Sequence, residues 1–277
     1  LMGYPADGAG AIQPGKAVAL QMPTAGIEPA PTTKVDLELN LDSRSPLTQP
    51  ATVAAKAAAD AVLDKTAADA TLVTAAAKHT AAKALSDAAP TDATLAANTA
   101  AALAALSLAT TADTDAATRV TNTAAAQVTA TAGPQIDFTD KSTYNNATSL
   151  TVYDAKGQDV ALTYYFQKAA TDQWNVYVTA NGVPLAGTAA MPVATATVTF
   201  PSNGGTPTSP LAPVPLNIPA TVNSAGVETL AITGVPMDLS NASQFGAKFG
   251  VTDLSQNGYA PGQLTSIQVE ENGIVMA

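Results

Sequence analysis

The chain has 277 residues and a formal net charge of −10 at pH 7, from 12 Lys and Arg against 22 Asp and Glu. This balance excludes the basic stripe that neutralises nucleic-acid phosphates, and it disfavours an anionic membrane surface as a partner. The absence of cysteine removes disulfides, thiolate metal sites and cysteine nucleophiles together. We also expect no membrane span and no secretory signal, because Asp, Lys and Thr interrupt the longest Ala-rich tract and no basic and apolar leader opens the chain.

The first part of the chain, up to about residue 41, is rich in Gly and Pro and contains one alternating segment. Val35, Leu37, Leu39 and Leu41 fall on one side of this segment, and polar residues separate them. Alternation with a period of two is typical of a strand with one buried face. The pattern therefore predicts a half-buried strand here.

The second part, residues 51–132, is an Ala/Thr/Asp tract without glycine and with Pro90 as its single proline. Alanine is the strongest helix former, so the tract predicts helix. Pro90 would end a first helix, and Thr91 or Asp92 could cap a second. We therefore expect a helical hairpin or a small helical bundle.

The apolar stripe of this tract is thin. Leu63, Ala67, Ala70 and Val73 recur near helical spacing, but alanine buries little area, so the helices would pack closely and weakly. A disordered segment is the alternative interpretation. Circular dichroism with and without residues 51–132 would decide between the two.

The third part, from about residue 133, is rich in β-strand patterns. Residues 149–153, 160–166 and 174–178 alternate like strands. Turn residues separate and follow them at 154–157, 171–173 and 181–182. This predicts a three-stranded meander, continued by short strands to about residue 235 in a sandwich or barrel.

Residues that could carry chemistry are few and poorly placed. His79 is the single histidine and has no ligand partner at i+4, so we expect a solvated helix residue. The acidic triplet 113–115 lacks the glycine and glutamate of a calcium loop, and Glu270 and Glu271 would point to opposite faces of a strand. Residues 10–17 approach a phosphate loop but have alanine where a hydroxyl should bind the metal.

Aromatic residues of the meander offer a further possibility. Tyr153, Tyr164, Tyr165, Tyr177 and Trp174 could form a ligand platform, although at strand spacing such residues usually pack on a sheet face. No serine-nucleophile elbow is present either. The sequence thus predicts no enzyme, no cofactor, no metal and no small-molecule substrate.

Several blocks of sequence together resemble one family. They are LMGYPAD at 1–7, NLDSR at 40–44, TYNNATSLTVYDAKGQDVALTYYFQK at 143–168, WNVYV at 174–178 and the closing stretch 244–277. In order and spacing they are similar to the bacterial flagellar hook protein. The resemblance implies a middle fragment of such a subunit, without the N- and C-terminal helical segments that drive polymerisation.

The resemblance also implies a fold and a function. The fold would be mainly β, with two nested β domains: a discontinuous inner domain at 1–42 and 239–277, and an outer sandwich or barrel-like domain at 43–50 and 133–238. The tract 51–132 would be an insertion into it. The function would be a structural subunit that assembles with copies of itself into a curved, flexible tube, a universal joint carrying motor torque to the filament.

The same resemblance implies a location, an export route and partners. The protein would lie outside the cell in the flagellar hook and would be exported by the type III apparatus. Rod proteins and hook–filament junction proteins would be its further partners. The insertion would either stiffen outer contacts between subunits or decorate the surface. Another appendage protein, such as a hook-associated protein or an adhesin-like module, is the alternative.

Some positions match the family's inner-domain motifs. These are Gly3, Tyr4, Pro5, Gln256, Asn257, Gly258, Tyr259 and Gly262. They are candidates for subunit contact. The structural interpretation is that Asn257-Gly258 forms a tight hairpin turn, that Gly258 and Gly262 supply turn dihedrals, and that Tyr4 and Tyr259 pack.

Overall fold

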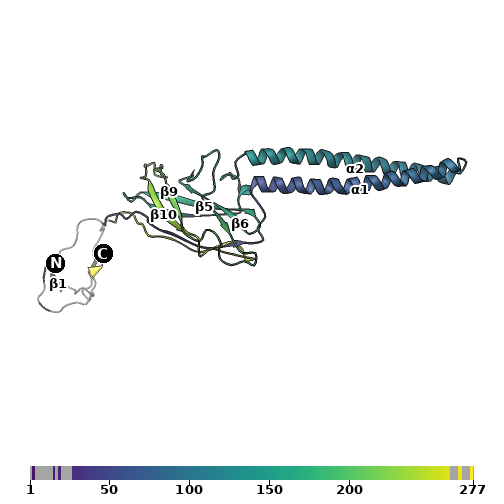
Figure 1. Ribbon diagram of the computed structural model, residues 1–277. Coiled ribbons are helices and arrows are strands. Elements are labelled where there is room, and N and C mark those ends of the chain that lie inside the picture. Colours follow the sequence, from purple (N-terminus) through teal and green to yellow (C-terminus); the bar gives the residue numbers. More distant parts are fainter. Residues whose placement is uncertain are drawn as a thin grey trace.

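The computed structural model describes residues 2–3, 15, 18–19, 27–262, 268–269 and 275–276. A β body occupies the middle of the molecule, and a long helical hairpin projects from one end of it (Figure 1). Residues 27–34 and 256–262 lie at the opposite end of the body. The molecule is therefore elongated, with the body between two differently built ends.

The Ala-rich tract forms two antiparallel helices, α1 (Pro50–Ala88) and α2 (Ala93–Ala132), which together we call the arm. The helical prediction is confirmed, including the break at Pro90. Asp92 is the N-cap of α2, and its Oδ1 accepts hydrogen bonds from the backbone of Thr94 at 2.8 Å and Leu95 at 3.2 Å. The cap satisfies two of the free N–H groups that open any helix.

The two helices meet along a seam in which alanine is the most frequent residue. Partly or fully buried residues recur at alternating spacings of three and four, the 3.5-residue period of a coiled coil. The α2 seam residues are Leu95, Thr99, Ala102, Leu106, Ala109, Asp113, Ala116, Val120, Thr123, Gln127 and Ala130. The predicted stripe was wrong: Leu63 is 68% exposed, Val73 is 70% exposed, and Ala67 and Ala70 are exposed as well. Small residues alternate in the seam with longer ones such as Leu95, Leu106 and Val120, so long apolar side chains lie both in the seam and outside it.

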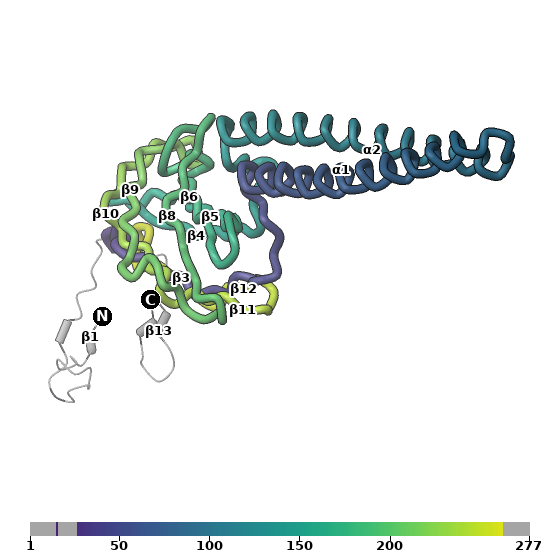
Figure 2. The backbone as a smooth tube through the Cα atoms, turned by 45° about the vertical axis from the view of Figure 1, so that its right-hand side comes forward, coloured from purple at the N-terminus to yellow at the C-terminus, as the bar shows by residue number. Residues whose placement is uncertain are grey.

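The body consists of two sheets of five strands each (Figure 2). Sheet A contains β3 (Val35–Asp42), β9 (Val214–Ile218), β10 (Ile232–Asp238), β11 (Ser243–Phe245) and β12 (Gly250–Gln256). Sheet B contains β4 (Asn146–Tyr153), β5 (Asp159–Ala170), β6 (Gln173–Ala180), β7 (Val183–Pro184) and β8 (Ala196–Thr199). A short 3-10 helix, η1 (Lys141–Thr143), precedes β4.

The predicted meander is confirmed as β4–β5–β6, with antiparallel pairing throughout. Its turns lie where the turn residues indicated. Gly157 has φ +75°, Asp172 has φ 56°, and Asn181 and Gly182 have φ 48° and 84°. Glycine, asparagine and aspartate tolerate this left-handed region better than other residues, which is why these positions reverse the chain.

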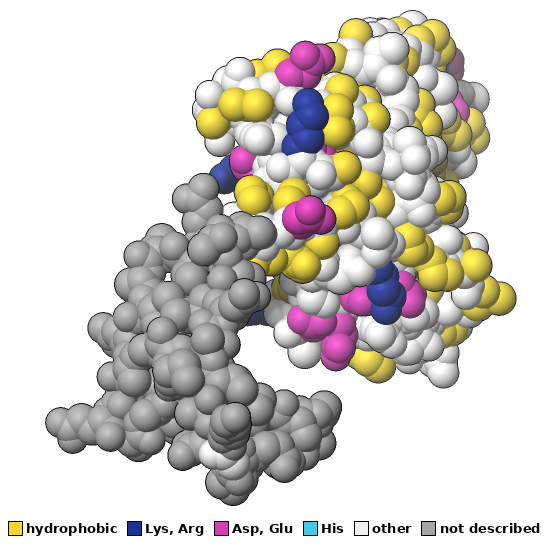
Figure 3. Space-filling model, turned by 90° about the vertical axis from the view of Figure 1, so that its left-hand side faces the viewer, with side chains coloured by type: hydrophobic (Ala, Val, Ile, Leu, Met, Phe, Trp, Pro, Cys, Tyr) yellow, Lys and Arg dark blue, Asp and Glu magenta, His cyan; other side chains and the backbone are white. Residues whose placement is uncertain are grey.

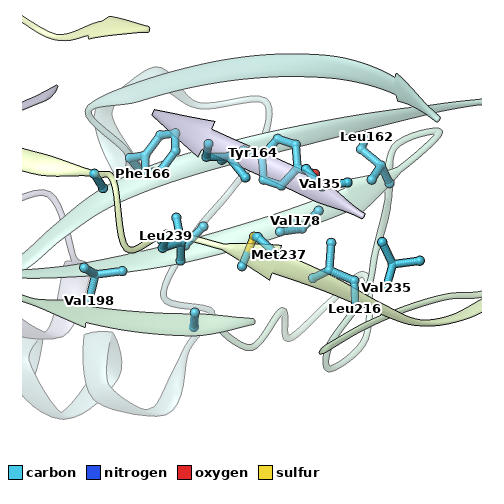
Figure 4. Packing of buried hydrophobic residues seen from close by; sticks show 14 of the residues in the cluster. Val35, Leu162, Tyr164, Phe166, Val178, Val198, Leu216, Val235, Met237 and Leu239 are labelled. Atoms are coloured by element: carbon cyan, nitrogen blue, oxygen red, sulfur yellow. The ribbon is translucent and has the colours of Figure 1, made fainter. Parts of the chain in front are cut away.

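A single hydrophobic core fills the space between the sheets (Figure 4). The alternating residues of β3 and β5 provide much of it, as the sequence predicted, and Val35, Leu162 and Phe166 have no exposed surface. Trp174 and Tyr164 are fully buried, so they pack in the core, as their strand spacing indicated, and do not form a ligand platform. Trp174 instead donates from Nε1 to Gln244 Oε1 at 2.7 Å and so joins the two sheets.

Strand pairing crosses the predicted domain limits. β3, assigned to the inner domain, pairs with β10, assigned to the outer domain, through Val35 and Met237. Both strands also contribute to the same core. The positions of the limits between the nested domains therefore stay a prediction.

Two short strand pairs lie outside the body. β1 (Met2–Gly3) pairs with β2 (Val18–Ala19), and β13 (Gln268–Val269) pairs with β14 (Val275–Met276), both antiparallel. The second pair agrees with a hairpin around Asn272 and Gly273, although these two residues lie outside the described residues, as do Glu270, Glu271 and most of residues 10–17.

Candidate functional site

The chain enters and leaves the body through two adjacent segments, residues 27–34 and 256–262, which we call the neck. Ile27 pairs with Gly262 and Ala30 with Tyr259, and each pair exchanges two backbone hydrogen bonds of 2.8–3.1 Å. The neck continues the antiparallel pairing of β12 with β3. Five of the predicted site residues lie in it, so the neck is the candidate functional site.

Asn257 and Gly258 do not form the predicted hairpin turn. The chain runs on without reversing, and residues 31–34 bulge opposite these two residues. The Oδ1 atom of Asn257 accepts hydrogen bonds from the backbone of Thr33 at 2.9 Å and Lys34 at 3.1 Å. Asn257 thus satisfies two N–H groups that the bulge removes from the strand pairing.

Gly258 is required for space rather than for turn dihedrals. A Cβ atom at this position would lie 2.4 Å from Thr32 Oγ1, 2.7 Å from Thr32 N and 2.9 Å from Ala30 O. Its φ is not among the positive values of the described glycines, and the same holds for Gly262, where a Cβ would lie 3.2 Å from the Ile27 side chain. The predicted turn-dihedral role of both glycines is therefore wrong.

Gln256 and Thr32 form the polar centre of the neck. Thr32 is buried, and its Oγ1 donates to Gln256 Oε1 at 2.7 Å and accepts from the backbone of Tyr153 at 3.0 Å. Gln256 Nε2 donates to the Gly258 carbonyl at 3.0 Å. Because Tyr153 ends β4, this network ties the neck to sheet B as well as to sheet A.

The β4–β5 turn packs directly against the neck. Gly157 lies so close to Pro29 and Pro261 that a Cβ atom would come within 2.6 Å and 2.4 Å of their side-chain atoms. Its φ of +75° adds a second reason for glycine. Two prolines, one from each neck segment, thus hold the turn and restrict the angle between neck and body.

The outer surface of the neck is partly apolar. Tyr259 is 49% exposed and Ile27 is 66% exposed, so the expected packing role of Tyr259 is not what the structure shows. Gly3 lies in β1 opposite Val18, away from the neck in the strand pairing. Tyr4 and Pro5 lie outside the described residues.

No pattern in the sequence indicated the residues that fix the arm to the body. Gln135 follows α2, and its Oε1 accepts from the backbone of Ala51 at 3.2 Å while its Nε2 donates to the carbonyl of Ala130 at 2.8 Å. Gln167, buried in β5, donates to the carbonyls of Gln135 at 2.6 Å and Thr143 at 2.7 Å. A single glutamine in a sequence has no periodicity that reveals such a role.

Lys168 at the end of β5 holds the connector between β3 and α1. It is buried, and its Nζ donates to the backbone carbonyls of Ser43 and Ser45. Beside it, the Arg44 guanidinium forms two hydrogen bonds with Asp42 and lowers the pKa of that carboxyl to about 2. The base of the arm is therefore fixed at both helix ends.

The described residues contain no group of three His, Asp or Glu side chains arranged to hold a metal. His79 lies in the seam of the arm and is partly buried, which differs from the solvated position expected for it. A hollow of about 680 Å³ runs along the arm and is lined mostly by alanine and threonine. These surfaces suit contact with a macromolecule better than chemistry on a small one.

Charges are dispersed over the face of the body that Figure 3 shows, where basic and acidic side chains alternate with apolar and neutral ones.

The arm differs from the body in that one of its helices is strongly apolar. By length and composition α2 could cross a membrane, because an 18-residue window has a mean hydropathy of 1.4 and only 6% of it is buried. The sequence-based expectation overlooked this because the charges of α2 lie in its second half. The expected absence of a membrane partner stays a prediction.

The neck, the sandwich and the arm define a class: a β-sandwich module that is joined to the rest of its chain through two adjacent strands and carries a helical insertion. Residues 120–259 match the family described as flagellar basal body protein FlaE D2 domain, and the chain belongs to that family. The match covers the end of α2, all of sheet B and most of sheet A, and it leaves out residues 51–119.

Known relatives agree with the resemblance inferred from the sequence. The chain is 30% identical over 144 residues to the flagellar hook protein FlgE of Salmonella typhimurium, a stretch that is 50% of this chain and 32% of that protein. It is 29% identical over 136 residues to the flagellar hook protein FlgE of Brucella abortus, 48% of this chain and 30% of that one. The matched part thus spans about a third of the length of these relatives.

Solved structures of hook proteins are also similar. A 32 kDa fragment of the flagellar hook protein FlgE from Caulobacter crescentus is 17% identical, with a TM-score of 0.31 over 41% of this chain and 46% of that one. The Helicobacter pylori flagellar hook protein FlgE2 is 20% identical, with a TM-score of 0.29 over 47% of this chain and 28% of that one.

Proposed function

We propose that the chain is the middle part of a flagellar hook subunit, which assembles with copies of itself into the curved tube between motor and filament. The observation that carries this proposal is the family match over residues 120–259, which covers every strand of the β body except β3. The hook proteins of Salmonella and Brucella match over a similar length. The location is then extracellular, in the hook of the flagellum.

The construction of the body suits a load-bearing part. One core joins both sheets, and the neck is tied to each of them by hydrogen bonds. Such a body transmits force with little internal deformation, because close-packed interiors have low compressibility. Bending of a tube then occurs between subunits, where dispersed charges and modest polar surfaces can slide.

The nested arrangement of domains forms part of the same proposal. Because β3 shares its sheet with β10, we place the division at the neck, near residues 27 and 262, rather than at 42 and 239. The inner domain would then comprise the parts of the chain before residue 27 and after residue 262. Rod proteins and hook–filament junction proteins would be the further partners, and the subunit would have no catalytic role.

The neck residues have a defined part in this proposal. They fix the neck against the body, through Gly258 against Thr32 and Gly157 between the two neck prolines. The exposed pair Tyr259 and Ile27 is the part of the neck available for contact with a neighbouring subunit.

Immunogold electron microscopy of flagellated cells tests the proposal, with antibody raised against this chain and a strain lacking the gene as control. Gold confined to the short curved segment between cell body and filament is the expected result. Gold along the filament, in a thin band at its base, or over the whole cell would overturn it and favour a hook-associated protein or an adhesin-like surface module.

A further inference from the structure

The outer half of the arm exposes an unusual amount of uncharged surface. Residues 93–112 of α2 contain no Asp, Glu, Lys or Arg. Leu103 is 53% exposed and Leu108 is 74% exposed, and Leu108 borders the hollow that runs along the arm. A helix that is apolar on all sides is normally covered by a partner. The question is what covers this one.

The charges of the arm, all of which the structure describes, point to the partner. Nearly every charged side chain of the arm has its own partner within the arm, and Asp92 caps α2. The ion pairs are Lys56–Asp60, Lys65–Asp69, Lys65–Asp113, Lys83–Asp87 and Arg119–Asp64. Among the arm residues, Lys78 and Asp115 are left without an ion pair. They have opposite charges.

Lys78 and Asp115 lie on the same side of the arm. Lys78 lines the hollow together with Leu108 and Ala112. Asp115 follows Leu108 by seven residues, two full turns of helix, and therefore faces the same way. One face thus carries a basic group, a central leucine and an acidic group in a row along the arm.

The spacing of these three groups is nearly symmetric. The Lys65–Asp113 and Thr99–Ala82 contacts place Leu108 level with residues 70–73 of α1. At a rise of 1.5 Å per residue, Lys78 lies about 10 Å from Leu108 towards the tip, and Asp115 lies about 10 Å from it towards the body. Along the arm axis, a two-fold rotation about Leu108 exchanges the levels of the two charged positions, of which Lys78 lies on α1 and Asp115 on α2.

We propose that this face binds the same face of a second copy of the chain, with the two arms antiparallel. Leu108 then meets Leu108 of the second copy at the two-fold axis, and Lys78 meets Asp115 on both sides of it. A contact made by one face with itself is isologous, and it closes at two copies.

The dimensions of the arm agree with such a pair. The axis lies near the middle of α1, whose 39 residues are about 58 Å long, so the tip of each arm ends near the base of the other. With a helix width of about 10 Å, the overlap covers about 600 Å² per copy, at the lower end of stable interfaces. Residues 50–132 have five basic and seven acidic side chains, a formal charge of −2 out of −10, so repulsion between arms is small.

The contact goes beyond assembly into a tube. Subunits of one hook all point the same way along it, whereas the antiparallel pair joins arms that point in opposite directions. It therefore links free subunits or two separate assemblies. Its success or failure is independent of where the protein is located on the cell.

Cysteine cross-linking tests the axis, and the cysteine-free chain is well suited to it. Leu108→Cys should form a disulfide-linked dimer on mild oxidation. Leu211→Cys is the matched control, because Leu211 is 84% exposed on the body and lies outside the proposed contact. Dimer from Leu108→Cys at no higher yield than from the control would overturn the proposal.

A charge exchange tests the pairing, measured by analytical ultracentrifugation of the full chain. Lys78→Asp and Asp115→Lys should each weaken self-association about tenfold, because each replaces two attractions by two repulsions. The double variant should restore it. Equal weakening in the double variant would overturn the proposal, and so would a monomeric wild-type chain at every concentration tested.

A membrane is the alternative partner for the apolar face of α2. Flotation with neutral phosphatidylcholine vesicles distinguishes membrane binding from pairing of two arms. The proposal expects the wild-type chain to stay with the protein fraction and the Leu108→Cys dimer to form without vesicles. Flotation of the chain with the vesicles, combined with no cross-linking in their absence, would overturn the proposal.

Discussion

At the scale of single residues, the neck depends on Gly258, which has a hydrogen atom where any other residue has a Cβ atom. We expect Gly258→Ala to lower the free energy of unfolding by about 2 kcal/mol, because the new Cβ would overlap the backbone of Thr32. Gly250→Ala is the matched control in the same antiparallel ribbon, since the nearest atom to its Cβ would be 4.0 Å away. Urea unfolding of both variants is the measurement. Equal stability of the two would show that the close approach has no energetic weight.

A buried hydroxyl in the core gives a second residue-scale prediction. Tyr164 has no exposed surface, and its hydroxyl has no hydrogen-bond partner among the residues that the structure describes. Tyr164→Phe should raise the free energy of unfolding by about 1 kcal/mol, because it removes an unpaired polar group. Tyr153→Phe at the end of β4 controls for the substitution itself. Destabilisation by Tyr164→Phe would mean that the hydroxyl has a partner.

The same residue predicts a response to alkaline pH. Burial raises the pKa of Tyr164 well above its usual value of 10. The folded state then keeps the phenolic proton at pH values where the unfolded state loses it, so stability is complete below pH 10 and falls as pH rises above it. Denaturant unfolding across this range should show a shallower loss for Tyr164→Phe than for the wild-type chain. An identical slope would assign the loss to other groups.

At the neck, the residue pattern predicted a turn that the structure does not contain. Asn257-Gly258 is a strong hairpin signal, because both residues tolerate the dihedrals of tight turns. In the structure Asn257 instead completes the hydrogen bonds of a bulge, and Gly258 makes room for Thr32. A dipeptide indicates which backbone dihedrals its own residues can adopt. It does not indicate that a segment 224 positions away in the sequence lies against it.

At the scale of elements, the start of α2 depends on one carboxylate. Asp92→Ala should cost about 1 kcal/mol, because the backbone N–H groups of Thr94 and Leu95 lose their acceptor. Asp92→Asn is the matched control and should keep most of the stability, since asparagine caps as well as aspartate. Thermal unfolding followed by helical circular dichroism is the measurement. A loss for Asn as large as for Ala would assign the effect to charge.

Local patterns predicted most elements and missed those that depend on distant partners. The structure confirms the alternation in β3 and β5 and the break at Pro90 in the arm. These features depend only on residues that are close together in the sequence. The seam was not recognised, because alanine fills both the seam and much of the outer face. A helical repeat cannot be recognised in a sequence when the same residue type occupies both the seam positions and the positions between them.

At the scale of the whole molecule, the order of strands in sheet A could not be predicted from local patterns. β3 lies between β12 on one side and, on the other side, β10 and β11 one after the other, all about 200 residues away in sequence. Hydrophobic alternation shows that a strand has a buried face, but it does not specify which other strand pairs with it. The joint core of both sheets follows from this pairing, and so does the position of the neck.

The arm and the body should be separable, because the hydrophobic core contains no residue of α1 or α2. The two ends of the arm are adjacent, as the hydrogen bond of 3.2 Å from Ala51 to Gln135 shows, so a short Gly-Ser linker can replace residues 50–132. We expect the shortened chain to lose most of its helical circular dichroism and to keep one cooperative unfolding transition. An arm that lacks two heptads from each helix keeps the seam in register and is the control. Loss of cooperative unfolding on complete removal, with retention in the control, would show that the arm supports the body through its base, by way of Gln135 and Gln167.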